Sequence, residues 1–174
     1  MEKRKYTFKL YPNKAQSESL MGMMRLHQKL YNAALEERID CYQKTGQSID
    51  HNHQQDSLTI IRKDDPEYRA LPCTSERMTL RRTDKAFKSF FRRIKKGETP
   101  GFPRFKSLNR FPSFELPFSG AWSLNPHPTK DKATFTLKGV GKIQAKAKAK
   151  HWGSLKTSQV MHKKGKWWLS VTLE

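Results

Sequence analysis

Polar and apolar side chains alternate over residues 3–11. Lys5, Thr7 and Lys9 separate three apolar positions. A period of two is typical of a strand with one buried face. We therefore expect a strand here, with its buried side formed by Tyr6, Phe8 and Leu10.

A helical period follows this strand. Pro12 ends the strand, and Asn13 with Gln16 has the spacing of a capping box. Residues 14–44 repeat their apolar positions every three or four residues, which predicts a long helix that ends at Gly46. Its apolar stripe comprises Leu20, Met23, Met24, His27, Leu30, Tyr31, Ala34 and Leu35.

Two more helices are predicted before the middle of the chain. The first spans about 51–63 and is broken by Asp65-Pro66. The second spans 74–96, with Thr74 or Ser75 as its cap and Glu76 in its first turn. One side of this third helix is apolar, with Leu80, Phe87, Phe90, Phe91 and Ile94. The opposite side is basic, with Arg81, Lys85, Lys88, Arg92, Lys95 and Lys96.

The segment 97–111 cannot continue this helix, because it is rich in Gly and Pro. Three aromatic residues interleave with three cations here. Aromatic rings can stack on bases while cations hold phosphates, but the same rings can also anchor a loop to a core. Both interpretations stay open for Phe102, Phe105 and Phe111, which alternate with Arg104, Lys106 and Arg110.

After Pro112 the pattern predicts strands. The alternating positions are Phe114, Leu116 and Phe118, and a further strand is expected over 132–138. In 142–150, period two sets Lys146, Lys148 and Lys150 opposite an apolar side, although Ala and Lys favour helices. A turn at residues 163–166 joins strands 157–162 and 167–173, with the core side formed by Trp167, Leu169, Val171 and Leu173.

These elements predict an α+β fold of two parts. Residues 1–11 pair with strands of 112–174 to close a small, OB-like β-barrel. Residues 12–111 form a three-helix insertion whose last segment, 97–111, returns to the barrel.

The charge is concentrated in two segments. The chain of 174 residues has a formal net charge of +19, and residues 81–110 and 132–174 each contribute +9. Such a surface attracts polyanions, above all RNA and DNA. No secretory signal and no apolar run of about 20 residues is present, so we expect a cytoplasmic protein that has no membrane partner. Cys41 and Cys73 lack the paired spacing of a zinc ribbon, and we expect reduced thiols.

Four stretches resemble TnpB (OrfB), the RNA-guided DNA endonuclease family that insertion sequences encode and that is related to type V CRISPR effectors. Their order and spacing match across nearly the whole chain, and the Gly-Phe-Pro-Arg-Phe-Lys run that starts at Gly101 is the most specific part. The stretches are Lys5–Pro12, Tyr31–Arg38, Ala86–Arg93 with Gly101–Ser107, and Gly165–Val171.

The resemblance implies a wedge-like barrel interrupted by a recognition lobe. Together they would hold a structured guide RNA, the guide–target heteroduplex and a short motif of the flanking duplex DNA. Base pairing then reads the sequence while protein cations hold the backbones. It also implies a prokaryotic, nucleoid-associated protein of a transposable element, in a family whose older descriptions use the words transposase and helix-turn-helix.

One departure concerns catalysis. The family's RuvC-like nuclease part, with an acidic trio for two metal ions, is expected after a strand like 167–173, and this sequence ends at Glu174. We therefore expect no catalytic residue, no metal site and no cofactor in this chain. Mg²⁺ is expected only in the nuclease part, which would be a further partner.

The expected nucleic-acid contacts are cations from the basic segments and the first strand. They are Lys5, Arg81, Arg82, Lys85, Lys88, Arg92, Arg93, Lys95, Lys96, Arg104, Lys106, Arg110, Lys146, Lys148 and Lys150.

Other interpretations remain. The main alternative is a stand-alone DNA-binding regulator of transposition that uses no guide RNA, and a ribosomal kind of RNA-binding protein also fits the composition. A metal-dependent enzyme would rely on His53 and Asp56, three residues apart, although a solvated polar helix start is the favoured interpretation. His27 on the apolar stripe is expected to be a core histidine.

Overall fold

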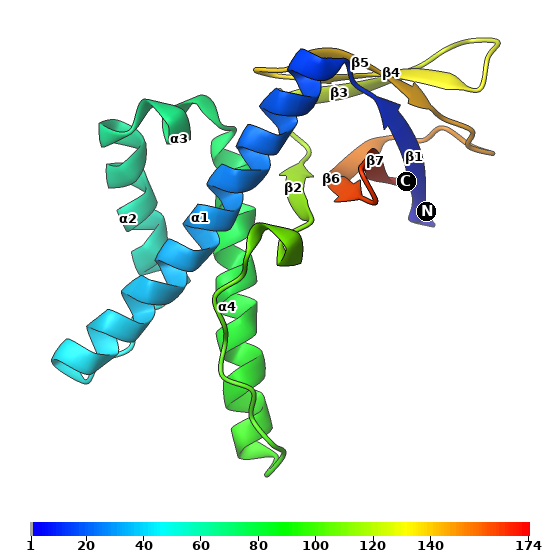
Figure 1. Ribbon diagram of the computed structural model, residues 1–174. Helices are drawn as coiled ribbons and strands as arrows, with labels where there is room; N and C mark the ends of the chain where they lie inside the picture. The colour runs from blue at the N-terminus through cyan, green and yellow to red at the C-terminus, as the bar shows by residue number, and fades with distance from the viewer. Residues whose placement is uncertain (1) are drawn as a thin grey trace. The chain divides into compact units, whose positions relative to one another are not determined.

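Seven antiparallel strands and four α-helices make up the fold, in a computed structural model that describes residues 2–174 (Figure 1). The class is α+β, as the sequence predicts. The strands are β1 (Arg4–Tyr11), β2 (Ser113–Pro117), β3 (Trp122–Pro126), β4 (Lys132–Leu137), β5 (Gly141–Lys146), β6 (Leu155–Lys163) and β7 (Lys166–Leu173). The helices are α1 (Lys14–Thr45), α2 (His51–Asp64), α3 (Pro66–Ala70) and α4 (Cys73–Lys95), followed by a 3-10 turn η1 (Leu108–Arg110).

The strands form one sheet in the order β2-β6-β7-β1-β5-β4-β3. Strand β1 pairs with β7 on one side and with β5 on the other, so the start and the end of the chain lie side by side (Figure 1). The pairing of residues 4–11 with strands after 112 is therefore confirmed.

The prediction of a closed barrel is wrong, because no ladder joins β2 to β3 and the sheet stays open. Proline ends both strands, at Pro117 and at Pro126, and proline has no backbone N–H to extend a ladder. The connection is held instead by Trp122, whose Nε1 donates to the carbonyl oxygen of Pro117 at 2.9 Å.

Alternation decides the buried face of the sheet. Ile143, Ala145 and Ala147 are buried while Lys146 and Lys148 are exposed, so residues up to Lys146 form a strand despite their helix-favouring composition. The predicted turn between β6 and β7 is confirmed, since Lys164 and Gly165 both have positive φ, 49° and 72°. Phe118 is 67% exposed because β2 ends one residue before it, and β3 is a strand that we did not predict.

Local signals place the helices. Gln16 N donates to Asn13 Oδ1 at 2.8 Å and Asn13 N donates to Gln16 Oε1 at 3.1 Å, which confirms the capping box of α1. Gly46, with φ of 69°, follows the end of α1. There are four helices rather than three, because Pro66 begins the short α3 after breaking α2, with Asp65 as its N-cap.

The start of α4 differs from the prediction. The helix begins at Cys73 with Pro72 as its N-cap residue, and no side chain caps it. Ser75 is instead buried inside the first turn, with its hydroxyl 3.1 Å from Nε2 of His27. Nδ1 of His27 lies 2.8 Å from the Thr79 hydroxyl. Burial lowers the pKa of His27 to about 3, with a smaller contribution from Arg82, so His27 is the expected neutral core histidine.

Contacts divide the chain into two compact units. The sheet unit comprises Met1–Met24 and Pro112–Glu174, and the helical unit comprises Arg25–Phe111. A core cluster of the helical unit joins Leu30 and Ala34 of α1 to Leu58 of α2 and Leu80 of α4. Cys41 and Cys73 are both free thiols. Within residues 2–174, no helix has the length and apolar character needed to cross a bilayer.

Candidate nucleic-acid interface

The second half of α4 is exposed on nearly all sides. Leu80 and Phe87 are buried, but Phe91 is 50% exposed and Ile94 is 49% exposed. The predicted apolar side therefore faces a core only up to Phe87. Beyond that residue the helix presents Arg92, Arg93 and Lys95 to solvent, and its C-cap residue, Lys96, is exposed as well.

Residues 97–111, which we call the return segment, are held against α1 by hydrogen bonds at Lys106. Lys106 N donates to Asn32 Oδ1 at 2.9 Å, and its carbonyl oxygen accepts from Asn32 Nδ2 at 2.9 Å and Gln28 Nε2 at 2.7 Å. These three bonds tie an irregular backbone to α1, because both of its polar groups find side-chain partners. Lys106 is thus held in place although it lies outside regular structure.

The three phenylalanines of this segment have different environments. Phe111 is buried, with its ring 5.8 Å from that of Tyr31 and the Arg82 guanidinium 5.1 Å over its face. Phe102 makes edge contacts with Phe87 and Phe90. Phe105 is 54% exposed. Phe111 therefore anchors the segment, Phe102 rests against α4, and Phe105 leaves a large part of its ring open to solvent.

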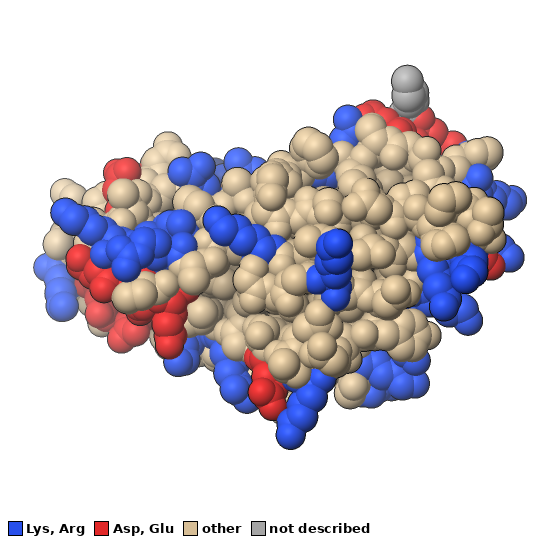
Figure 2. Space-filling model, turned by 90° about the horizontal axis from the view of Figure 1, so that it is seen from above, with Lys and Arg blue, Asp and Glu red and all other residues tan. Residues whose placement is uncertain are grey.

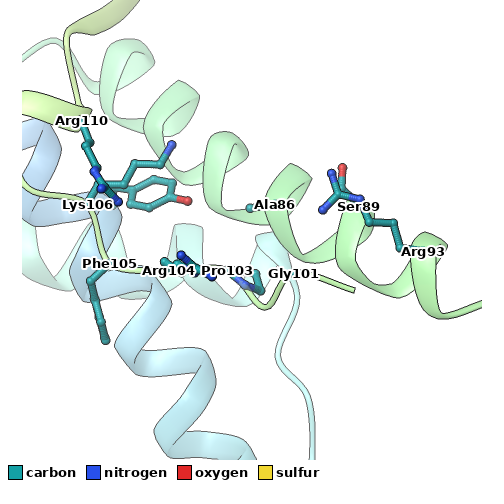
Figure 3. Close-up of a pocket in the computed structure, with 10 residues that line it drawn as sticks. Ala86, Ser89, Arg93, Gly101, Pro103, Arg104, Phe105, Lys106 and Arg110 are labelled. Atoms are coloured by element: carbon teal, nitrogen blue, oxygen red, sulfur yellow. The ribbon is translucent and has the colours of Figure 1, made fainter. Parts of the chain in front are cut away.

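A groove of about 380 Å³ lies between α4, the return segment and Tyr31 (Figure 3). We call it the α4–loop groove. Its ten lining residues include four cations and no carboxylate. The lining comprises Tyr31, Ala86, Ser89, Arg93, Gly101, Pro103, Arg104, Phe105, Lys106 and Arg110.

The groove cations form no ion pair with a carboxylate among the residues that the structure describes. These cations are Arg93, Arg104, Lys106 and Arg110. The ammonium of Lys106 lies 4.7 Å from the centre of the Tyr31 ring. Burial and the nearby Arg82 both lower the pKa of Lys106. A phosphate beside Lys106 would favour the charged form of its ammonium and would offset both effects.

Sequence comparison finds a family match for the start of the chain. Residues 1–47 match the family model HTH_OrfB_IS605, described as a helix-turn-helix domain. They thus resemble the N-terminal domain of the OrfB/TnpB family. The match implies DNA binding in a transposon-associated protein. No nuclease domain is recognised in the chain, and no curated protein shows significant similarity to it.

The OrfB-like segment has an unexpected form. Its described residues, 2–47, contain strand β1 and the single helix α1, and no turn separates two helices. A helix-turn-helix reads the major groove with its second helix. This segment does not offer that geometry.

The remaining expected cations lie on both units. Most are exposed, namely Lys5, Arg81, Lys85, Arg92, Lys95, Lys96, Lys146 and Lys150. Lys88 and Lys148 are also exposed, but they form ion pairs, since Lys88 binds Asp84 at 2.8 Å and Lys148 lies 3.8 Å from Asp131. Arg82 is partly buried, with its guanidinium over the ring of Phe111. On the face shown in Figure 2, Lys and Arg form several separate groups rather than one continuous area.

His53 and Asp56 lie exposed near the start of α2. Asp50 is the N-cap and accepts from His53 N at 2.9 Å. Among residues 2–174, no group of three or more His, Cys, Asp or Glu is placed to hold a metal ion. A polar helix start accounts for this sequence.

Sequence reasoning did not single out Gln28, Asn32 or Tyr31 as parts of the interface. Tyr31 was assigned to the apolar stripe, and it is indeed buried, but its ring also forms one wall of the groove. Gln28 and Asn32 lie four residues apart on α1, on one side of the helix. That pair of amides beside a stripe of apolar residues was the available signal.

Proposed function

We propose that this chain binds nucleic acid through the α4–loop groove, as the nucleic-acid-holding part of a TnpB-like, RNA-guided DNA-targeting system. The observation that carries the proposal is the set of four cations with no carboxylate partner around one groove. Phosphate oxygens are the ligands that such a set prefers. The match of residues 1–47 supports the transposon context.

The proposed partners are a structured guide RNA and the target DNA. Four residues of the groove suit an RNA scaffold with unpaired bases. The partly exposed ring of Phe105 can stack on a base, while Arg93, Arg104 and Arg110 can hold phosphates. The remaining cations of α4 would extend the phosphate contacts. The protein would read RNA shape and backbone, and base pairing would read the target.

A second candidate is a DNA-binding regulator that uses no RNA. The description of the matching family model as a helix-turn-helix domain favours it. The strand-and-helix form of residues 2–47 weighs against standard major-groove recognition.

Gel-shift titrations of nuclease-treated protein separate the two candidates. We expect RNA recovered from the natively purified protein to bind at least about tenfold more tightly than a duplex DNA of similar length, because only RNA offers unpaired bases for stacking. A tighter complex with duplex DNA in the absence of RNA would contradict the first candidate and support the regulator.

A further inference from the structure

Three lysines form a row across adjacent strands of the sheet unit. Lys9 of β1 is in register with Lys146 of β5, and Lys146 is in register with Lys132 of β4. Neighbouring strands lie about 4.8 Å apart. The row therefore sets three positive side chains directly beside one another on the same face of the sheet.

Such a row is unfavourable without an anion. Like charges directly opposite each other destabilise a pair of strands. Among the described residues, no carboxylate forms an ion pair with Lys9, Lys132 or Lys146. Asp131 is adjacent to Lys132 in the chain, but its ion pair is with Lys148, at 3.8 Å.

An exposed aromatic ring lies beside the row. Tyr11 is 50% exposed and is in register with Gln144. It lies two residues after Lys9 in β1, and therefore on the same face of the sheet as the lysines. The ammonium of Lys9 lies 5.1 Å from the centre of its ring. A hollow of about 740 Å³ lies here, and its lining contains three lysines and one carboxylate. The lining comprises Tyr11, Lys130, Asp131, Lys132, Gln144, Ala145 and Lys146.

The opposite face of these strands is core. Each of the three lysines has a neighbour in its strand that points to this opposite face. These neighbours are Leu10, Ala145 and Ala133, and all three are buried. The lysines and Tyr11 are thus carried on a packed sheet and not on a mobile loop. A rigid sheet surface with cations and an aromatic ring suits unpaired nucleotides, whose bases stack on rings while their phosphates meet cations.

We propose that the face of β1, β5 and β4 that carries Lys9, Lys132, Lys146 and Tyr11 is a second binding site, which takes a single-stranded polynucleotide. The phosphates of the strand lie along the lysine row, and a base stacks on Tyr11. A single strand is favoured over a duplex because stacking on Tyr11 needs an unpaired base. This inference rests on the proposed nucleic-acid-binding function, and it places a separate contact on the other compact unit.

The first test neutralises the row. The variant Lys9→Gln, Lys132→Gln, Lys146→Gln is compared with the matched control Lys138→Gln, Lys163→Gln, Lys166→Gln, which removes the same charge from exposed positions in or beside turns of the sheet unit. Fluorescence anisotropy is measured with labelled oligo(U) and oligo(dT) of about 12 nucleotides. We expect the row variant to lose about 100-fold in affinity near 0.1 M salt and about 2 in the log–log salt slope, since each single-strand contact contributes about 0.7.

The second test addresses Tyr11. Tyr11→Ala is expected to weaken binding by roughly 5- to 100-fold, whereas Tyr11→Phe keeps the ring and the affinity. A hairpin duplex of the same length should bind more weakly than the single strands and should not respond to Tyr11→Ala. The two single-strand probes show whether the site prefers RNA or DNA.

Stability provides a check on folding. Removing three opposed lysines relieves repulsion, so the row variant should melt at or above the wild-type temperature while its binding is lost. Affinity equal to that of the turn control would overturn the inference. If the row variant binds as tightly as its control but a variant of the α4–loop groove does not bind, only the second site is excluded. If both variants bind as tightly as their controls, the proposed function is excluded too.

Discussion

Replacing Arg93, Arg104 and Arg110 together by glutamate is expected to lower the affinity for structured RNA by roughly 10²- to 10³-fold near 0.1 M salt. Each phosphate contact changes the log–log salt slope by about 0.7 to 0.9, so the loss of three contacts removes two to three decades at this salt concentration. The slope itself should become shallower by about 2 to 3. Filter binding over a range of salt concentrations measures both quantities.

The structure decides which cations to change. Arg93, Arg104 and Arg110 are exposed and form no ion pair with a described carboxylate, whereas Lys106 is half-buried and Lys88 already pairs with Asp84, so these two are left unchanged. The matched control is Lys29→Glu, Lys63→Glu, Arg77→Glu, three exposed cations of the same unit outside the groove. A groove variant that binds as well as this control would exclude the groove from the interface.

The second large effect concerns stability. Arg62→Ala is expected to lower the free energy of unfolding by about 3–5 kcal/mol at about pH 8. Arg62 forms an ion pair with Glu76, whose side chain is 0% exposed and whose Oε2 has no hydrogen-bond partner. Arg62 also donates to the carbonyl oxygens of Tyr68 and Leu71, both at 2.9 Å. Its removal leaves a buried carboxylate without its counter-ion.

The effect should depend on pH. Burial raises the pKa of Glu76 to about 7, and Arg62 opposes this rise. Because the folded state holds this proton more tightly than the unfolded chain does, the contribution of Glu76 to stability falls as pH rises from about 4.5 to 7. In Arg62→Ala the pKa rises further, so the cost at about pH 5, where Glu76 is protonated, should fall to the roughly 1–2 kcal/mol of the lost hydrogen bonds.

Urea unfolding of each variant at both pH values tests this prediction. The double variant Arg62→Ala, Glu76→Gln cannot ionise at position 76, so its cost relative to Glu76→Gln alone should be similar at the two pH values. An equal loss for the single variant Arg62→Ala at pH 5 and pH 8 would show that the buried carboxylate is not the cause.

Local signals account for the parts of the fold that the sequence predicts well. The capping box of Asn13 and Gln16, Gly46 after α1 and Lys164-Gly165 between β6 and β7 each act within a few residues of the chain. Strand alternation, as in β5, is equally local. These features depend on backbone geometry that neighbouring residues impose, so reading the chain in short windows is sufficient.

Features that depend on distant partners were predicted less well. Phe91 and Ile94 have the right spacing for a buried face, but no element among residues 2–174 buries them, whereas Phe87 is buried. Ser75 fits a helix cap, but it lies buried against His27. Closure of a barrel requires β2 and β3 to meet, and alternation within each strand carries no information about that pairing. The register of Lys9, Lys132 and Lys146 is likewise invisible before the strands are ordered.

The contrast also applies to the candidate interface. The basic segments were evident from charge alone, and the interleaved aromatic residues marked the return segment. The fixed position of Lys106 was not evident from the sequence, because it depends on Asn32 and Gln28, more than seventy residues earlier. Charge patterning identifies the ligand class, while hydrogen bonds between distant segments decide which cations are held in place.

The prolines at the ends of β2 and β3 have a consequence for self-association. An open sheet exposes a backbone row on each outer strand, and such rows recruit strands from other molecules. Here both outer strands are only five residues long, and each finishes at a residue without an N–H donor. A strand from another molecule would form few backbone hydrogen bonds at either edge of the sheet. The molecule can therefore leave its sheet unclosed with little tendency to build intermolecular β-structure.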